Sequence, residues 1–474
     1  MTRHPVRSKR PNILFLLADD QRHDTIGALG NSEVMTPTLD RLVRAGFTFT
    51  QAHIPGGTVG AVCMPSRAML HTGRTLFALE QHGQRIPQTH ALLGEVLRQE
   101  GYRTCGIGKW HNGPDAYARS FTDGAEIFFG GMWDHWNVPA CAFDPTGQYA
   151  GRSKHILDPM RTRSTVRMAC DHIRPGKHST ELFADAAVDW LNGYESEQPF
   201  FLYVSFMAPH DPRSMPERFR ERYDPQRLRL PENFLPEHPF DYGIRGIRDE
   251  LLAPQPRTEA DVREHLADYY GMISHLDEET GRILSTLKRR GLDDNTIIVY
   301  CADNGLALGQ HGLFGKQSAY EHSIRVPLSL SGPGIPQGER SGAYVYLLDL
   351  FPTLCELAGV QIPPSVQGIS FAPALGDSQW TGRETLYAAY ESKVRAVKDN
   401  QYKLIQYRTA EGVRTQLFDL RSDPGERWDL SGQEAFKTIE ARLREELLRY
   451  KSEWKDEQHP AGALYWQQQG GTEG

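Results

Sequence analysis

Residues 11–20 read PNILFLLADD, and this stretch indicates how the chain folds. Asn12–Leu17 is a short apolar run that begins after Pro11 and ends before polar residues. A continuous apolar run of this kind is typical of a strand that is buried on both faces of a parallel sheet. It is also shorter than the ~7–15-residue core of a signal peptide and runs into two aspartates. We therefore expect a central strand in a cytoplasmic protein.

Similar apolar runs recur along the chain and alternate with segments of helical spacing. This alternation is the signature of a doubly wound α/β fold, so we predict a large mixed, mostly parallel sheet sandwiched by helices. The segment 211–257 is rich in Pro, Arg and Glu, and we interpret it as a surface excursion. The further predicted strands are 102–107, 200–206, 296–302 and 326–330, and the predicted helices are 38–45, 66–73, 90–99, 182–191, 260–290 (with breaks near Gly271 and Gly281) and 347–358.

The pattern changes near residue 375. Beyond it, short segments of alternating polarity are separated by turn residues, and a strongly charged amphipathic helix follows at 433–455. Alternation of this kind is typical of an antiparallel sheet. We therefore divide the chain into an α/β domain over residues 1–375 and a small α+β subdomain over residues 376–474. The predicted strands of the subdomain are 385–390, 394–398, 402–407 and 415–420.

Composition excludes several classes of protein. The 474 residues include 53 Lys and Arg and 60 Asp and Glu, a net charge of −7, which argues against a nucleic-acid partner. No apolar run reaches the roughly 18 residues that span a bilayer, so no membrane partner is expected. The 6 cysteines are too sparse for a disulfide framework, and no CxxC pair suggests structural zinc.

Two acidic pairs lie at the ends of predicted strands. Asp19 and Asp20 follow the first strand directly, and Asp303 and Asn304 follow the strand at 296–302. A single pair of this kind usually just ends a strand. Two pairs in matching positions would meet at one edge of the sheet, because open α/β sheets bind ligands at the carboxyl ends of their strands. Their oxygens suit Ca²⁺ or Mg²⁺ and argue against Zn²⁺.

Cationic residues gather around the same predicted edge. Residues 63–74 read CMPSRAMLHTGR, in which Pro65 suits a helix start and Arg67 lies near the helix N-terminus. A guanidinium and a helix N-terminus both favour a bound oxyanion. Further positive or proton-transferring groups above a metal would suit a tetrahedral oxyanion. They follow other predicted strands: Lys109, His111, His210 and Lys316.

At this point a resemblance emerges. CMPSRAMLHTGR resembles the signature C-x-P-S-R followed by T-G-R of the formylglycine-dependent (type I) sulfatases, a family of the alkaline phosphatase superfamily. The resemblance runs from about residue 11 to 420, and QLFDLRSDPGERWDL (416–430) is similar to the family's usual ending. In chain order, the other matching motifs are Asp19-Asp20, GKWH (108–111), APH (208–210), Asp303-Asn304 and Lys316.

The resemblance implies an alkaline phosphatase-like fold and a modified nucleophile. A maturation enzyme would convert Cys63 to formylglycine, whose hydrate attacks sulfur through one hydroxyl. Asp303 would take the proton of that hydroxyl and Arg67 would orient it. The implied metal is Ca²⁺, the family's usual ion. Its ligands would be Asp19, Asp20, Cys63 in its modified form, Asp303 and Asn304.

The resemblance also implies roles for the cationic set. Lys109, His210 and Lys316 would bind the sulfate oxygens. Either His210 or Lys316 would protonate the departing alcohol. His111 would act as base when the second hydroxyl expels sulfate and the aldehyde re-forms. An unmodified Cys63 could not complete this last step, because its sulfate ester has no second hydroxyl.

Rival functions remain open. A phosphonate or phosphate monoester hydrolase of the same superfamily can carry C-x-P-S-R, but such enzymes tend to replace the Lys-x-His and Asp-Asn pairs, which are intact here. An arylsulfatase would share the whole set. An inactive homologue that only binds oxyanions or sugars would have lost a motif residue, and none is lost.

The sequence favours a sulfated carbohydrate, small enough to enter a cell, over an aryl sulfate. Aromatic residues in the loop 128–143 could stack on a sugar ring, and a basic loop at 172–178 could bind a second sulfate or a carboxylate. The alternative is that these residues only pack or are solvated. Oligomeric state is left open. The candidate substrate contacts are Trp133, His135, Trp136, His172, Arg174, Lys177, His178, Lys393 and Arg395.

Overall fold

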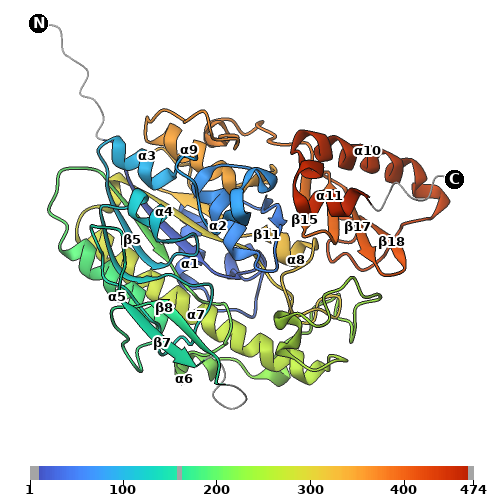
Figure 1. The fold of residues 1–474 in the computed structure, drawn as a ribbon, viewed down its shortest axis with the longest axis horizontal. Helices are drawn as coiled ribbons and strands as arrows, with labels where there is room; N and C mark the ends of the chain where they lie inside the picture. The colour runs from blue at the N-terminus through green and yellow to red at the C-terminus, as the bar shows by residue number, and fades with distance from the viewer. Residues whose placement is uncertain (1–9, 157–162, 468–474) are drawn as a thin grey trace, which may run out of the picture.

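The computed structural model describes residues 10–156 and 163–467. Its centre is an eight-stranded sheet with the order β13-β2-β12-β10-β1-β9-β5-β6 (Figure 1). From β10 to β6 every neighbouring pair is parallel, and β12 is antiparallel to both β10 and β2. This is the mixed, mostly parallel sheet predicted from the sequence. Its strands are β1 (Asn12–Ala18), β2 (Phe47–Phe49), β5 (Arg103–Lys109), β6 (Asp123–Phe128), β9 (Phe200–Ser205), β10 (Thr296–Ala302), β12 (Leu328–Ser331) and β13 (Glu339–Ser341).

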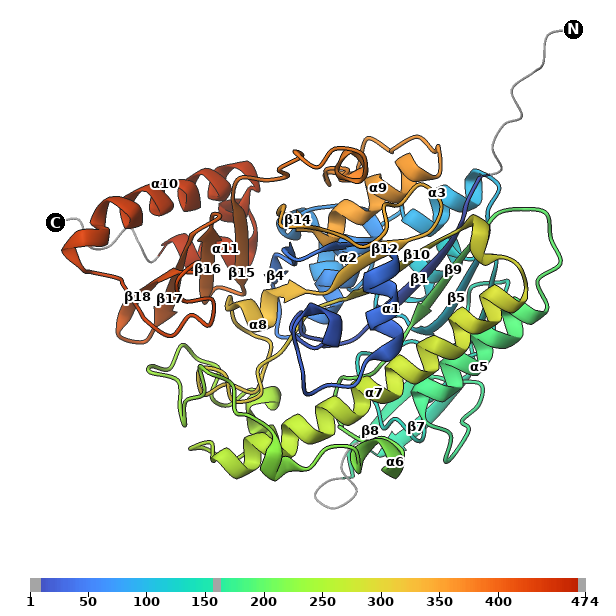
Figure 2. The ribbon, with the colours of Figure 1, turned by 180° about the vertical axis from the view of Figure 1, so that it is seen from behind.

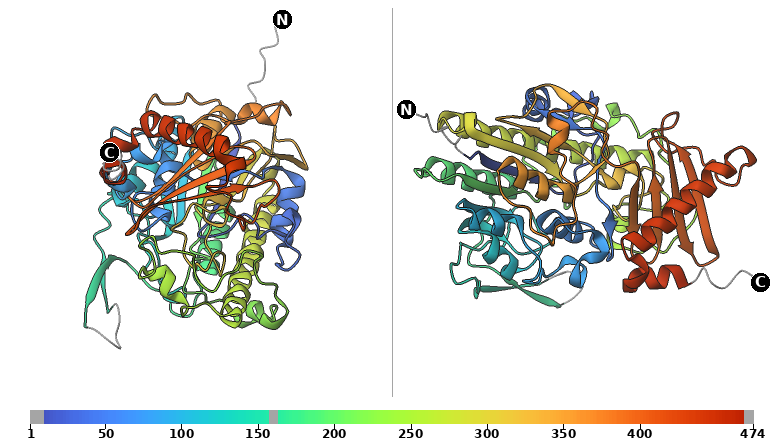
Figure 3. Two further views of the ribbon diagram at one scale, coloured as in Figure 1. Left: turned by 90° about the vertical axis from the view of Figure 1, so that its right-hand side faces the viewer. Right: turned by 90° about the horizontal axis from the view of Figure 1, so that it is seen from above.

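Strand β1 joins the two halves of the core, because all of its residues are buried and alternate between two faces. Ile13, Phe15 and Leu17 pack in one apolar cluster, and Leu14 and Leu16 pack in another. Helices cover both faces, as the other ribbon views show (Figures 2 and 3). The first cluster includes residues of α2 (Cys63–Thr72), α3 (Leu93–Gln99) and α9 (Leu350–Leu357), and the second includes residues of α1 (Pro37–Ala45), α5 (Ser179–Asn192) and α7 (Glu259–Arg289).

Helix α7 is continuous through the two glycines at which breaks were predicted. A Cβ atom at Gly281 would lie 2.8 Å from the Thr38 hydroxyl oxygen, so the missing side chain allows α1 and α7 to approach closely. The Thr258 side chain accepts a hydrogen bond from the Asp261 N–H and caps the helix. In the described ranges no helix combines the length and the apolar character needed to cross a bilayer.

Helix α2 begins at Cys63, so the start predicted after Pro65 was wrong. A proline is tolerated in the first turn because the N–H groups there have no acceptor within the helix. The consequence is that Cys63 is itself part of the helix N-terminus. The helix ends at Gly73, whose φ of 62° lets its N–H bond to the Met69 carbonyl.

The segment 211–257 is less exposed than predicted. It contains α6 (Glu217–Arg220) and a short 3₁₀ turn at Arg248–Leu252. Glu250 is buried, pairs with Arg257 at 2.6 Å and accepts the N–H groups of Phe314 and Gly315. These contacts fasten the segment to the loop that follows β10. The other short elements are β3 (Ala52–His53), β4 (Gly56–Gly57), α4 (Pro114–Ser120), β7 (Arg152–Ile156), β8 (Thr165–Ala169), α8 (Glu321–Ile324), β11 (Arg325–Val326) and β14 (Val345–Tyr346).

The C-terminal residues form the predicted antiparallel sheet, which lies beside the main body of the molecule (Figure 1). A fifth strand, β4, pairs parallel to its edge and comes from the N-terminal half of the chain. Because this sheet includes a strand from the N-terminal half, the domain boundary placed near residue 375 stays a prediction. The elements are β15 (Leu386–Tyr390), β16 (Val394–Lys398), β17 (Tyr402–Thr409), β18 (Gly412–Asp419), α10 (Lys437–Glu453) and α11 (Pro460–Gln467).

Arg395 on β16 belongs to the core of this part of the molecule. Its guanidinium is buried, pairs with both carboxylate oxygens of Asp456 at 2.6 and 2.9 Å, and stacks 4.5 Å from the Tyr465 ring centre. Asp456 also accepts hydrogen bonds from Tyr387 and Trp466. Arg395 therefore joins the sheet to the C-terminal helices and is not positioned for the predicted substrate contact.

We predict that Arg395→Met lowers the free energy of unfolding by about 3–5 kcal/mol, because it leaves the Asp456 carboxylate buried without its counterion. Lys393→Met is the matched control. Lys393 pairs with Glu391 at 2.5 Å but is partly exposed, so its loss should cost about 0–1 kcal/mol. Urea denaturation measures both. Equal effects of the two substitutions would contradict the structural role of Arg395.

Candidate active site

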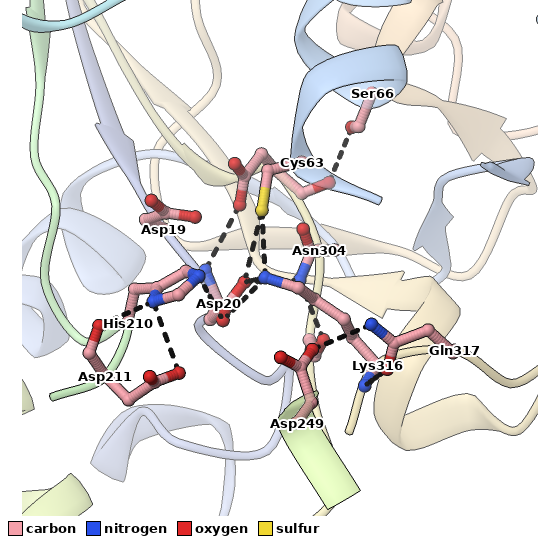
Figure 4. Close-up of polar contacts among 12 residues, drawn as sticks. Asp19, Asp20, Cys63, Ser66, His210, Asp211, Asp249, Asn304, Lys316 and Gln317 are labelled. Atoms are coloured by element: carbon pink, nitrogen blue, oxygen red, sulfur yellow. Dashed lines mark hydrogen bonds and ion pairs between the residues drawn. The ribbon is translucent and has the colours of Figure 1, made fainter. Parts of the chain in front are cut away.

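The carboxyl ends of four neighbouring strands bring the predicted site residues together (Figure 4). Since β10, β1, β9 and β5 are adjacent and parallel, the residues that follow them meet at one edge of the sheet. Helix α2 contributes two more side chains, and the loop after β10 contributes another. The residues gathered in this way are Asp19, Asp20, Cys63, Arg67, Lys109, His111, His210, Asp303, Asn304 and Lys316.

Asp20 makes the largest number of contacts shown in the close-up (Figure 4). Lys316 Nζ lies 2.7 and 2.9 Å from its two carboxylate oxygens, and Asn304 donates to Oδ1 at 2.7 Å. Cys63 Sγ is 3.7 Å from Oδ1, and His210 Nε2 is 3.6 Å from Oδ2. One carboxylate therefore links the thiol, the lysine and the histidine.

The backbone of Asp20 is held in the left-handed region, with a φ of 65°. Such a conformation costs about 1–3 kcal/mol for a residue other than glycine. Two hydrogen bonds stabilise it: the Asp20 N–H donates to Asp303 Oδ1 at 3.1 Å, and its carbonyl accepts from the Tyr269 hydroxyl at 2.6 Å. The strain is typical of a functional site, since surrounding contacts must impose it.

Arg67 and Lys109 are the counterions of the other two carboxylates. Arg67 Nε donates to Asp303 Oδ2 at 2.7 Å, and its Nη2 lies 3.7 Å from Asp19 Oδ2. Lys109 Nζ contacts the same oxygen of Asp19. The Ser205 hydroxyl at the end of β9 accepts from Arg67 Nη1 at 2.5 Å and fixes the guanidinium plane. Arg67 thus bridges the ends of three strands.

These cations do not offset the cost of burying Asp19. Burial, and then the charge of Asp303, raise the pKa of Asp19 to about 7. Asp19 Oδ1 and Asn304 Oδ1 are buried and have no hydrogen-bond partner among the described residues. Two orphaned oxygens beside crowded carboxylates fit a hard divalent cation, which would satisfy both and reduce the repulsion.

Cys63 and Lys316 form a close pair in which the proton stays on sulfur. Burial raises the pKa of the Cys63 thiol well above its usual range, although Lys316 Nζ is only 2.9 Å from Sγ. Burial alone would lower the pKa of Lys316, but the Asp20 carboxylate outweighs it and the net shift is upward. The site therefore holds a neutral thiol beside a charged ammonium group.

Both site histidines are neutral. Burial and the charge of Lys316 hold the pKa of His210 well below its usual range, and its Nδ1 lies 2.7 Å from the Asp211 carbonyl. Burial and the charge of Lys109 lower the pKa of His111 in the same way. The His111 ring packs over Gly131, where a Cβ atom would come within 2.6 Å of its Cε1. A neutral imidazole can accept a proton but cannot supply one.

Sequence reasoning missed three residues of the site. Asp249 lies on the segment interpreted as a surface excursion, accepts from Gln317 Nε2 at 2.7 Å and is next to Lys316 (Figure 4). No local signal marked Asp249. Gln317 is adjacent to the predicted Lys316, and Ser205 is a polar residue at the end of an apolar strand, so both positions carried a weak signal.

Two of the predicted substrate contacts are structural instead. His135 is fully buried, lies 2.6 Å from the Ser179 hydroxyl and 2.9 Å from the His210 carbonyl, and so supports the backbone of His210. His178 is also fully buried. It accepts the Thr180 N–H at the start of α5 and contacts the Ser214 carbonyl at 2.9 Å. Their polar atoms are used within the chain, which leaves none for a sugar.

The remaining predicted contacts are partly exposed and already have partners. Trp133 packs against His155 and Trp136 against His178. His172 and Arg174 both contact the Glu126 carboxylate, at 2.6 and 3.0 Å, and Lys177 pairs with Glu181 and Asp185. The basic loop at 172–178 is therefore largely neutralised by carboxylates of the chain itself.

Comparison with known proteins agrees with this geometry. The sulfatase family model matches residues 11–360, and a model described as the C-terminal part of N-sulphoglucosamine sulphohydrolase matches residues 309–453. The chain therefore belongs to the sulfatase family and is a sulfuric ester hydrolase.

Individual relatives match over most of their length. Arylsulfatase K of Xenopus laevis is 31% identical over 87% of this chain and 78% of its own. An ulvan-active sulfatase of Formosa agariphila is 29% identical over 94% of this chain and 82% of its own. A solved structure described as a complex with its substrate D-glucosamine-2-N,6-O-disulfate has a TM-score of 0.75 at 22% identity, covering 96% of this chain and 99% of its own. The last likeness shows the alkaline phosphatase-like fold.

We predict that Asp19→Asn changes how the stability of the chelator-treated protein depends on pH. Because the pKa of Asp19 is raised to about 7, the stability that its proton confers is present at low pH and is lost as the pH rises through 7. Between pH 5.5 and 8 the wild type should lose about 2 kcal/mol relative to the variant, at about 1.36 kcal/mol per pH unit. Urea denaturation at both pH values measures this, and a difference independent of pH would contradict it.

Proposed function

We propose that this sulfatase hydrolyses sulfate monoesters of a carbohydrate, with a formylglycine made from Cys63 as nucleophile. The observation that carries the proposal is the position of Cys63: in the first turn of α2, within contact of Lys316 and beside the Asp20 carboxylate. A hydrated aldehyde at this position supplies one hydroxyl to attack sulfur and a second one to release sulfate.

A calcium ion is the cation we propose for the sheet edge, with Mg²⁺ as the alternative. Its ligands would be oxygens of Asp19, Asp20, Asp303 and Asn304, together with the modified residue 63. When bound, the cation supplies positive charge that offsets the charge of the nucleophile and of the sulfate oxygens. The orphaned oxygens of Asp19 and Asn304 support this assignment.

The protein's own residues divide the proton transfers. Asp303 accepts the proton of the attacking hydroxyl, and Arg67 keeps that carboxylate in place through its 2.7 Å hydrogen bond. Lys109 and Lys316 hold the sulfate oxygens through their ammonium groups. The neutral His210 uses its one N–H on the Asp211 carbonyl, so its Nε2 would need a second proton to contact sulfate. His111 takes the proton of the second hydroxyl, which its neutral state permits.

Lys316, and not His210, is the acid that protonates the departing alcohol. The sequence left both open, but their electrostatic environments differ. Lys316 carries a proton because the Asp20 carboxylate raises its pKa, whereas burial and neighbouring cations lower the pKa of His210. An acid must hold its proton before the S–O bond breaks.

A carbohydrate is the substrate class that the surroundings of the site favour. The carboxylates of Asp211 and Asp249 lie next to His210 and Lys316. They already pair with Arg248, but their remaining lone pairs can accept hydrogen bonds from sugar hydroxyls. Similarity to an ulvan-active sulfatase supports this class, while the similarity to arylsulfatase K keeps aryl sulfates as the competing one.

The central test combines mass spectrometry with a substrate panel. In protein produced with a maturation enzyme, the tryptic peptide that contains Cys63 should carry an aldehyde in place of the thiol. The matured protein should act on sulfated sugars, and Cys63→Ala should lose at least about 10³-fold in kcat. A retained thiol under these conditions would sink the formylglycine mechanism. Faster turnover of every aryl sulfate, or of phosphonate esters, would contradict the carbohydrate assignment.

The acid assignment predicts a leaving-group effect. Lys316→Ala should slow hydrolysis of a sugar sulfate by about 10²–10⁴-fold, but should slow an aryl sulfate much less, because a phenolate leaves without a proton. Lys109→Ala is the control: it removes a sulfate contact without removing the acid, so both substrates should suffer alike. The same pattern for His210→Ala, with none for Lys316→Ala, would transfer the role to His210.

A further inference from the structure

A second cluster of metal-ligating side chains lies between helices α5 and α7, which run side by side along one face of the sheet (Figure 2). Glu181 is in the first turn of α5, and His275 and Glu279 are four residues apart on α7, so they share one face of that helix. One ligand atom from each residue lies within 4.8 Å of the other two. None of the three belongs to the site at the sheet edge.

His275 is the unusual member of this cluster. Its side chain is 0% exposed, and neither ring nitrogen has a hydrogen-bond partner in the described part of the chain. Leaving a buried polar group unsatisfied costs stability, and such groups are rare in native proteins. The Nε2 atom lies 3.6 Å from Glu181 Oε1, too far for a hydrogen bond but oriented toward the carboxylate.

The surroundings keep the His275 ring fixed and neutral. It stacks on Phe219, with ring centres 4.6 Å apart, and packs against His178 at 4.7 Å. Burial, and then the charge of Arg218, lower its pKa to about 3. A neutral imidazole is the form that binds metal ions.

The carboxylates of the cluster have incomplete counterions. Glu279 is 3% exposed, and burial raises its pKa even though Arg282 contacts its Oε2. Lys177 contacts Oε2 of Glu181 at 3.2 Å, which leaves Oε1 on the side of His275. Asp185 also pairs with both Lys177 and Arg282, so each of these cations is shared between two carboxylates.

We propose that Glu181, His275 and Glu279 form a second metal site, which binds a divalent transition metal ion of the Zn²⁺ class and ties α5 to α7. One imidazole and two carboxylates are a ligand set that suits Zn²⁺, whereas the all-oxygen set at the sheet edge suits Ca²⁺. Metal binding would satisfy the orphaned nitrogen of His275 and would supply positive charge to two carboxylates that share their cations with Asp185. The proposal does not depend on the proposed substrate or nucleophile.

The test is a Zn²⁺ titration of the full chain in excess Ca²⁺, so that the sheet edge is already filled. Equilibrium dialysis with elemental analysis should find one Zn²⁺ per chain. Glu181→Gln and Glu279→Gln should each weaken its Kd by at least about tenfold, since loss of an outer partner alone costs about 10–100-fold. Glu278→Gln is the matched control on the same helix: Glu278 is partly exposed, pairs with Arg218 and Arg222, and should leave the Kd unchanged.

Two further measurements keep the proposal falsifiable if a variant folds poorly. Zn²⁺ should raise the Tm of the wild type and of Glu278→Gln, because a ligand that binds only the native state stabilises it. X-ray absorption of the wild-type complex should show nitrogen and oxygen ligands. No bound Zn²⁺, or a Kd unchanged in both Gln variants, would overturn the proposal. A sulfur ligand would also overturn it, since it would move the ion to the cluster at Cys63.

Discussion

Three carboxylates, those of Asp19, Asp20 and Asp303, are buried together at the carboxyl edge of the central sheet, and much of the structure compensates for their mutual repulsion. Each has a cation of the chain beside it: Lys109 contacts Asp19, Lys316 contacts Asp20, and Arg67 contacts Asp303. Removing charges from water is costly unless they are paired and hydrogen-bonded. The pairing does not offset the cost of burying Asp19, whose pKa is raised, and the unpartnered oxygens of Asp19 and Asn304 are what make the edge suitable for a divalent cation.

The charges at the sheet edge also influence the protonation states of the histidines and of Lys316. Burial, and then the cations that neutralise the carboxylates, lower the pKa values of His111 and His210, so the histidines are neutral while Lys316 keeps its proton. A division of this kind lets one buried site contain both bases and an acid near neutral pH. The strained backbone of Asp20 also depends on contacts within the site, because the carboxylate of Asp303 and the hydroxyl of Tyr269 hold it by hydrogen bonds. The strained and buried polar groups at the sheet edge therefore lower the free energy of unfolding, and the apolar core around β1 raises it.

Most of the fold and the central site could be predicted because their signals are local. An apolar run buried on both faces, followed at once by acidic residues, indicates both a central strand and the functional end of that strand. Where prediction failed, the deciding contact was remote in sequence. Arg395 and Lys393 are two positions apart and are both basic, yet only Arg395 is buried, where it forms an ion pair with Asp456. Asp249 reaches the site only because Glu250 and Arg257 fasten its segment to the loop after β10.

By itself the sequence determined the class of fold, the order of the motifs and the chemical types of the site residues. The reason is that a buried strand and the C-x-P-S-R motif are each recognised from residues that are neighbours in the chain. Only the tertiary structure decided how charge and protons are distributed among them. It also decided that His135 and His178 support the scaffold, that Lys316 is the better acid, and that His275 is left without a partner between two helices. The physical reason is that pKa shifts, burial and orphaned polar atoms depend on neighbours that are distant along the chain and adjacent only after folding.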